Sequence, residues 1–156
     1  MKNTTVCYLE HGTQYLLLHR TKKENDENAG KWIGVGGKCE ENESPEDCML
    51  REVREETGLS VTQHRLRGVI TFVSDAWEGQ YMYLFTASKW HGALTDCDEG
   101  ELAWVERTDM LHLPLWEGDR IFLALLAEER PFFSLKLVYQ GDSLQQAVLD
   151  GTPLTL

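Results

Sequence analysis

Short apolar runs separated by polar turns dominate the chain and predict a protein rich in strands. Two of these runs, residues 6–9 and 15–18, flank His11-Gly12-Thr13 and are typical of a β-hairpin. Further strands are predicted at residues 32–35, 66–73, 81–87, 102–105 and 132–139. The polar stretches 21–31 and 74–80 are expected to be loops, and the tail after residue 139 has no clear pattern.

Two segments have helical rather than alternating periodicity. The first follows Ser44, a good N-cap, with Pro45 at the first helical position and Asp47 three residues after the cap, and Gly58 is placed to end it. The second covers residues 119–129, and Pro131 terminates it. Because the strands outnumber two helices that do not alternate with them, the pattern favours an α+β fold with a mixed sheet between helices.

The first predicted helix has an acidic face. At about 100° per residue, Glu52, Glu55 and Glu56 lie on one side of it. Such a trio is often only a solvated surface, but hard divalent cations such as Mg²⁺ also prefer carboxylate oxygens. The preceding segment favours a cation, because the glycine pair Gly36-Gly37 allows backbone to approach a ligand and the Lys38 ammonium can meet a phosphate oxygen.

The spacing of these residues resembles the Nudix box. Its defined positions are filled by Gly37, by Glu43 and by the run Arg51-Glu52-Val53-Arg54-Glu55-Glu56-Thr57-Gly58-Leu59. The resemblance implies a hydrolase of a nucleoside diphosphate linked to another moiety, with an α/β/α sandwich fold and Mg²⁺, or Mn²⁺, as the metal. It further implies that Glu52, Glu55, Glu56 and the Gly37 carbonyl ligate the metal. By the same resemblance Arg51 orients a glutamate through a salt bridge, and Glu43 supports the site without binding the metal itself.

A further ligand or base is expected outside the box. In the acidic stretch 95–101, before the predicted strand 102–105, Glu99 is similar in placement to the additional glutamate of the MutT-like branch. The alternative is an acidic loop without a role. Arg20, at the end of a predicted strand, is a candidate phosphate contact by analogy.

The choice of nucleotide rests on residues outside the box. The segments 32–38 and 115–119 look like the base-binding elements of the MutT/MutX-type triphosphatases, which hydrolyse 8-oxo-dGTP and related purine triphosphates. Trp116 would stack on the base and Asp119 would accept hydrogen bonds from it, although Trp116 is equally suited to a core. Mammalian members carry Asn where this chain has Ile33 and Asp-Asp where it has Gly118-Asp119, so strict selectivity for the oxidised base does not follow.

Other functions remain open at this point. They are hydrolysis of ADP-ribose, a sugar nucleotide or a dinucleoside polyphosphate, and a non-catalytic nucleotide-binding module. Such modules usually lose box carboxylates, whereas Glu52, Glu55 and Glu56 are all present here.

Composition and charge limit the classes of partner that the protein is expected to bind. The net charge of −11 disfavours polymeric DNA or RNA, whereas a small anionic nucleotide needs only local positive charge. Five of the fifteen basic residues provide it between positions 20 and 38: Arg20, Lys22, Lys23, Lys31 and Lys38.

The remaining sequence features bear on class and location. The 156 residues fit one domain, residues 1–156. No apolar run is long enough to cross a membrane, and the N-terminus has no signal core. The four cysteines lack C-x-x-C spacing and are typical of reduced thiols, which favours a cytoplasmic protein.

Overall fold

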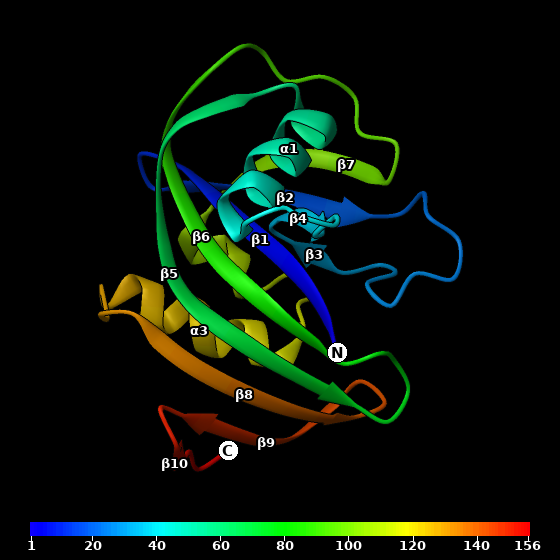
Figure 1. Ribbon diagram of the computed structural model, residues 1–156, viewed down its shortest axis with the longest axis vertical. Coiled ribbons are helices and arrows are strands. Elements are labelled where there is room, and N and C mark those ends of the chain that lie inside the picture. Colours follow the sequence, from blue (N-terminus) through cyan, green and yellow to red (C-terminus); the bar gives the residue numbers. More distant parts are fainter.

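The computed structural model describes residues 1–156 and contains ten strands and three helices (Figure 1). The strands are β1 (Lys2–His11), β2 (Gln14–Arg20), β3 (Trp32–Ile33), β4 (Val35–Lys38), β5 (Ser60–Ser74), β6 (Gln80–His91), β7 (Gly100–Glu106), β8 (Phe133–Gln140), β9 (Ser143–Leu149) and β10 (Thr152–Pro153). The helices are α1 (Pro45–Thr57), α2 (Arg107–Met110) and α3 (Glu117–Ala127). None of them is long and apolar enough to cross a membrane.

The sheet is mixed, which confirms the predicted fold class. Strand β1 runs parallel to β6 and antiparallel to β4, while β5 pairs antiparallel with β6 and parallel with β8. Strands β9 and β10 extend this sheet beyond β8. The β1–β2 hairpin leads to a second group in which β2 pairs antiparallel with both β3 and β7.

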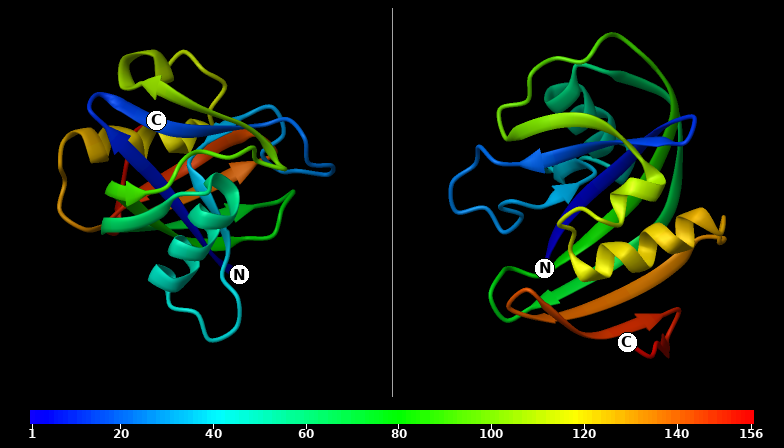
Figure 2. Two further views of the ribbon diagram at one scale, coloured as in Figure 1. Left: turned by 90° about the horizontal axis from the view of Figure 1, so that it is seen from above. Right: turned by 180° about the vertical axis from the view of Figure 1, so that it is seen from behind.

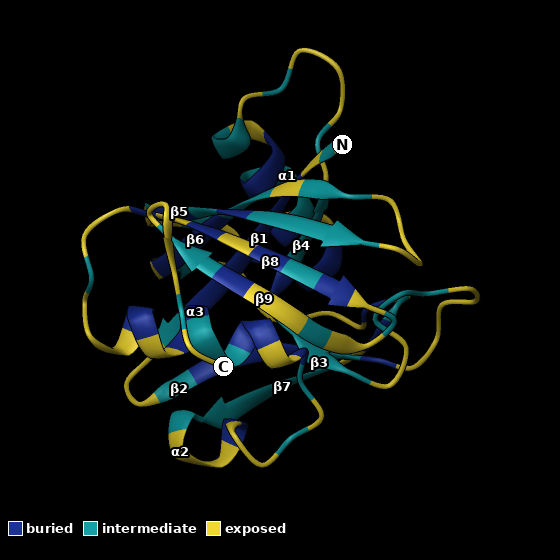
Figure 3. Cartoon of the chain, turned by 90° about the horizontal axis from the view of Figure 1, so that it is seen from below, coloured by how far each residue is buried: buried dark blue, intermediate teal, exposed yellow.

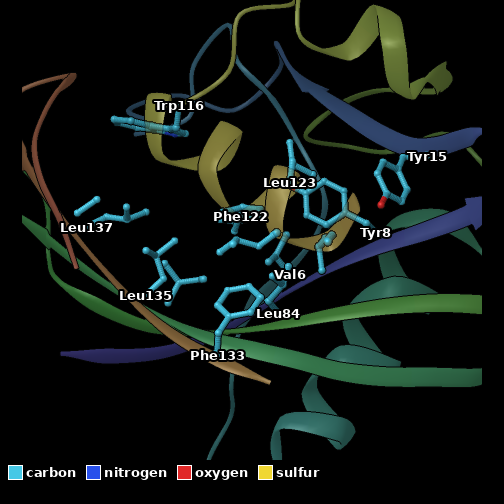
Figure 4. Close-up of a cluster of buried hydrophobic side chains, with 14 of the residues drawn as sticks. Val6, Tyr8, Tyr15, Leu84, Trp116, Phe122, Leu123, Phe133, Leu135 and Leu137 are labelled. Atoms are coloured by element: carbon cyan, nitrogen blue, oxygen red, sulfur yellow. The ribbon is translucent and has the colours of Figure 1, made fainter. Parts of the chain in front are cut away.

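Alternation along the central strands places α1 and α3 on opposite sides of the sheet (Figure 2). On β1, Val6 and Tyr8 belong to the hydrophobic cluster that contains Phe122 of α3, shown in Figure 4. Their neighbours Cys7 and Leu9 belong to a second cluster that contains residues of α1. Buried positions therefore concentrate on the strands and on the inner faces of the two helices, while the loops are largely exposed (Figure 3).

The predicted signals of α1 are all realised. Ser44 and Asp47 form a reciprocal capping box, in which each side chain accepts a hydrogen bond from the other residue's backbone N–H. Gly58 ends the helix in the left-handed region, with φ of 80°. The orientation of the acidic face is thus set by strong local signals at both ends.

Several predicted boundaries were wrong. The expected strand 32–35 is split at Gly34 into β3 and β4, because the strands pair with different partners, β2 and β1. Helix α3 begins two residues earlier than predicted and ends at Ala127, and the expected strand 66–73 is part of the much longer β5. The tail without a clear pattern forms β9 and β10, because pairing with β8 supplies the hydrogen bonds that its composition did not indicate.

Candidate active site

A cavity of about 220 Å³ is bordered by β1, β4, the loop 21–31 and the start of α3. Gly37 and Lys38 of β4 line it, and so do Trp116 and Asp119 at the start of α3. Arg20 and part of the loop 21–31 form another wall. The structure therefore places Gly37, Trp116 and Asp119 around one space, whereas the predicted carboxylate ligands Glu52, Glu55, Glu56 and Glu99 do not line it.

The three box glutamates of α1 differ sharply in exposure. Glu56 is only 9% exposed, and its Oε2 atom has no hydrogen-bond partner. The Glu52 side chain is largely buried, whereas that of Glu55 is 56% exposed. Gly37 lies directly against Glu52, since a Cβ atom at residue 37 would come within 2.6 Å of the Glu52 carboxyl carbon. A larger residue at position 37 would therefore force the Glu52 carboxylate to move.

Burial and the repulsion of nearby carboxylates raise the pKa values of Glu56 and Glu52. The pKa of Glu56 rises to about 9, first because the group is desolvated and then because Glu99 and Glu52 are close by. Desolvation also raises the pKa of Glu52. Leaving a carboxylate buried without a partner is costly, and a bound cation would remove that cost. The residues present therefore fit a divalent cation.

The side chains do not form a finished metal centre by themselves. No three His, Cys, Asp or Glu side chains are placed so that they could hold one metal ion. Glu52 and Glu99 are instead engaged by Arg51 and Arg20. Each of these two carboxylates therefore already has a guanidinium partner in addition to any cation it would bind.

Arg51 is the hub of the α1 side. Its Nε and Nη2 atoms donate to the two carboxylate oxygens of Glu43, each at 2.8 Å. Its Nη1 atom donates to Glu52 at 2.8 Å and to Glu55 at 3.2 Å, and Nη2 also donates to the Lys38 carbonyl at 3.1 Å. Because of the Arg51 guanidinium, the pKa of Glu43 falls to about 2. Arg51 therefore ties β4 and the loop before α1 to the glutamate face.

Arg20, which lines the cavity, forms an ion pair with Glu99. The Nη1 atom of Arg20 lies 3.2 Å from Glu99 Oε2, and Lys23 lies 3.7 Å from Glu99 Oε1. On its other side Arg20 forms a two-pronged ion pair with Asp26. The predicted phosphate contact is thus already engaged by two carboxylates, and its contact with phosphate stays a prediction.

Trp116 and Asp119 border the cavity from α3. The Trp116 ring packs edge-on with Phe72 and Tyr139, and Lys31 Nζ lies 4.4 Å from its centroid. Trp116 is 6% exposed and belongs to the α3-side cluster, so it combines core packing with a place in the cavity wall (Figure 4).

The carboxyl of Asp119 is likewise buried, and desolvation raises its pKa to about 7. The charges of Lys31 and Arg120 limit this rise. Asp119 is therefore poised to change its charge near neutral pH.

Sequence patterns did not reveal several residues of the site. Asp26 holds Arg20, and Asn28 Oδ1 accepts a hydrogen bond of 2.7 Å from Trp116 Nε1. Both lie in the loop 21–31, which has no periodicity to interpret. Phe72 and Tyr139 lie on predicted strands, but only the pairing of β5 with β8 brings them to the cavity.

The chain was then compared with known proteins. A NUDIX domain model matches residues 2–126. An uncharacterized Nudix hydrolase of Bacillus subtilis (strain 168) is 33% identical over 124 residues, which cover 76% of this chain and 75% of that protein. The oxidized purine nucleoside triphosphate hydrolase of Mus musculus is 32% identical over 111 residues, covering 70% and 71% respectively. The CTP pyrophosphohydrolase of Escherichia coli (strain K12) is 28% identical over 139 residues, covering 81% and 95%.

The fold has a counterpart among solved structures. The crystal structure of a MutT protein from Bacillus halodurans superimposes with a TM-score of 0.85 at 26% sequence identity. The superposition covers 96% of this chain and 98% of that one. The similarity therefore extends beyond the matched domain to β8 and β9.

Proposed function

Because the chain belongs to the NUDIX family and is a MutT-type Nudix hydrolase with the α/β/α sandwich, we propose that it is a Mg²⁺-dependent purine nucleoside triphosphate diphosphatase. Its substrates would be 8-oxo-dGTP and dGTP, and its products the nucleoside monophosphate and pyrophosphate. The observation that supports this proposal is one cavity lined both by Gly37, which lies directly against Glu52 of α1, and by the Trp116–Asp119 pair of α3.

The metal would be held by the acidic face of α1 together with nearby groups from other segments. Glu56, with its unpartnered oxygen, Glu52, Glu55 and Glu99 would provide ligands together with the Gly37 carbonyl. When bound, Mg²⁺, or Mn²⁺, neutralises phosphate oxygens and makes a bound water more acidic. Arg51 keeps Glu52 in place, and Glu43 keeps Arg51 in place.

Positive charge along the cavity wall would orient the polyphosphate. Lys38 and Lys23 border the cavity, and neither is buried. We infer cleavage between the α and β phosphates, with water attacking the β phosphorus. Hydrolysis in ¹⁸O-labelled water should then place the label in pyrophosphate, and label in the monophosphate would contradict this.

The α3 side would recognise the base. An ionised Asp119 can accept hydrogen bonds from a guanine-type N1–H and exocyclic amine, which makes a purine with both donors the preferred base. Ile33, which lines the cavity, offers no hydrogen bond to distinguish an oxidised from a normal purine. We therefore expect 8-oxo-dGTP and dGTP to differ less in turnover than the name of the mouse relative suggests for that protein.

A pyrimidine triphosphate is the main alternative, because one relative is a CTP pyrophosphohydrolase. A panel of 8-oxo-dGTP, dGTP, ATP and CTP, assayed for pyrophosphate, with ADP-ribose assayed for AMP, separates the candidates. The proposal predicts the highest kcat/KM for the two guanine nucleotides. Turnover of ADP-ribose alone, or of CTP in preference to both, would show that the purine assignment is wrong.

A further inference from the structure

Two oppositely charged side chains are almost completely buried in the cavity wall. The Arg20 side chain is 7% exposed and that of Asp26 is 4% exposed. Arg20 Nε donates to Asp26 Oδ2 at 2.9 Å and Nη2 donates to Asp26 Oδ1 at 3.1 Å, which is the strong two-pronged geometry. The remaining Arg20 nitrogen, Nη1, lies 3.2 Å from Glu99 Oε2. Asp26 therefore fixes the guanidinium that faces Glu99.

Asp26 also organises the base side of the cavity. Its Oδ1 atom accepts a hydrogen bond of 3.1 Å from the backbone N–H of Asn28. The Asn28 side chain in turn accepts the 2.7 Å hydrogen bond from Trp116 Nε1. A continuous series of polar contacts thus joins Glu99, beside the carboxylates of α1, to Trp116 on α3. Asp26 is the one residue in this series that contacts both halves.

The loop that carries Asp26 is held by polar contacts rather than by core packing. No residue between 21 and 31 is among the buried residues of either hydrophobic cluster. Its other attachments include the backbone bond from Lys22 to the Glu99 carbonyl, the ion pair of Glu27 with Lys2 at 3.6 Å and the surface ion pair of Lys31 with Asp142. Exposed ion pairs stabilise little, whereas a buried two-pronged one fixes geometry. Asp26 therefore gives the middle of the loop its one buried two-pronged ion pair.

We propose that Asp26 is a positioning residue for the hydrolysis, holding Glu99 and Trp116 in their working positions through Arg20 and Asn28. The inference rests on the proposed function, since Glu99 and Trp116 are assigned there to the metal and the base. Loss of Asp26 frees Arg20 to rotate, so that Glu99 loses its fixed partner, and it releases Asn28 from Trp116. Both ends of the site are therefore disturbed by one substitution outside the Nudix box.

The test separates the contacts that lead from Asp26 through Arg20 to Glu99 from those that lead through Asn28 to Trp116. Steady-state kinetics, with Mg²⁺ and the best substrate of the panel above, are measured for wild type, Asp26→Ala and Asn28→Ala. Asp150→Asn is the matched control, because Asp150 also pairs with an arginine, Arg130, and also accepts a backbone N–H. In parallel, the indole N–H resonance of Trp116 is followed by ¹H–¹⁵N NMR without substrate and assigned with Trp116→Phe.

Asp26→Ala should lower kcat about 10- to 100-fold, as expected when a partner behind a metal ligand is lost, and raise KM several-fold. Asn28→Ala should raise KM by a similar factor and leave kcat within about twofold. Both variants should shift the Trp116 indole resonance, and Asp150→Asn should change none of these quantities. If Asp26→Ala does not fold, Asp26→Asn, which keeps an acceptor oxygen, should show the same pattern with smaller changes.

Three results would overturn the proposal. They are kinetics of Asp26→Ala equal to those of the control, a fall in kcat for Asn28→Ala as large as for Asp26→Ala, and an unshifted Trp116 resonance in both variants. A wrong substrate assignment is recognised separately, because it appears as a different preference of the wild-type protein. The NMR readout is independent of any substrate.

Discussion

Replacing Asp119 by Asn should change how the stability of the protein depends on pH. The Asp119 carboxyl is buried, and its pKa is raised from 3.8 to about 7, first by desolvation. At a pH between these two pKa values, Asp119 of the folded protein holds a proton that the unfolded chain has released. Stability therefore falls as the pH rises from about 4 to 7 and changes little above 7 as far as this group is concerned.

The size of the effect follows from the same shift. A difference of about 3 pKa units corresponds to a ceiling of about 4 kcal/mol, reached once the buried group is ionised. Relaxation around a buried charge lowers such figures in real proteins, so we expect about 2 kcal/mol. Asp119→Asn removes the titration, so its stability relative to wild type should rise by about 2 kcal/mol between pH 4.5 and pH 8.

Urea unfolding of both proteins at pH 4.5, 6, 7 and 8, without metal, measures this directly. Asp109→Asn, at an exposed position of α2, controls for the loss of a carboxyl in general. A free-energy difference between Asp119→Asn and wild type that stays constant within about 0.5 kcal/mol over this range would refute the reasoning. It would mean that water reaches Asp119 in the folded protein and cancels the desolvation.

Three further substitutions test the site. Gly37→Ala should cost at least tenfold in kcat, because its Cβ would fall 2.6 Å from the Glu52 carboxyl carbon. The control Gly141→Ala meets no neighbouring atom but has a φ of +57°, so it reports backbone strain without a steric contact. Equal rates for Gly37→Ala and wild type would contradict the contact with Glu52. Arg51→Lys should weaken Mg²⁺ binding about 10- to 100-fold, since an ammonium cannot hold Glu43 and Glu52 with the geometry of a guanidinium. A magnesium titration of activity measures this change. An unchanged midpoint of the titration would exclude the positioning role of Arg51. Trp116→Phe should raise KM several-fold with little change in kcat, because the hydrogen bond to Asn28 and part of the cavity wall are lost. Trp77→Phe, at an exposed position, is the control. An unchanged KM for Trp116→Phe would show that Trp116 does not belong to the base site.

The predicted and unpredicted parts of the fold differ in the range of the forces that determine them. Helix α1 could be predicted together with its caps, because Ser44, Asp47 and Gly58 act within a few residues of one another. The division of β3 from β4 could not be predicted, because it depends on β2 and β1 as partners. The same holds for β9, whose alternation is too weak to recognise without β8 beside it.

The site shows the same contrast. The positions of the box glutamates follow from helical spacing, but their unequal burial does not: Glu56 faces inward and Glu55 outward because α1 packs on the sheet through one side only. Arg20 was expected to meet phosphate, yet its contacts in the structure are Asp26 and Glu99, both distant from any motif. Local sequence patterns contain no information on such pairings between a loop and a strand.

The most direct measurement compares Mg²⁺-dependent release of pyrophosphate from 8-oxo-dGTP by wild type, Glu56→Gln and Glu46→Gln. Glu56 and Glu46 both lie on α1, but only Glu56 has a buried, unpartnered carboxylate oxygen. We predict that Glu56→Gln loses at least about a hundredfold in kcat/KM, because an amide replaces the charged ligand, while Glu46→Gln stays within about twofold of wild type. A Glu56→Gln protein as fast as wild type would contradict the assignment of the reaction to this carboxylate cluster.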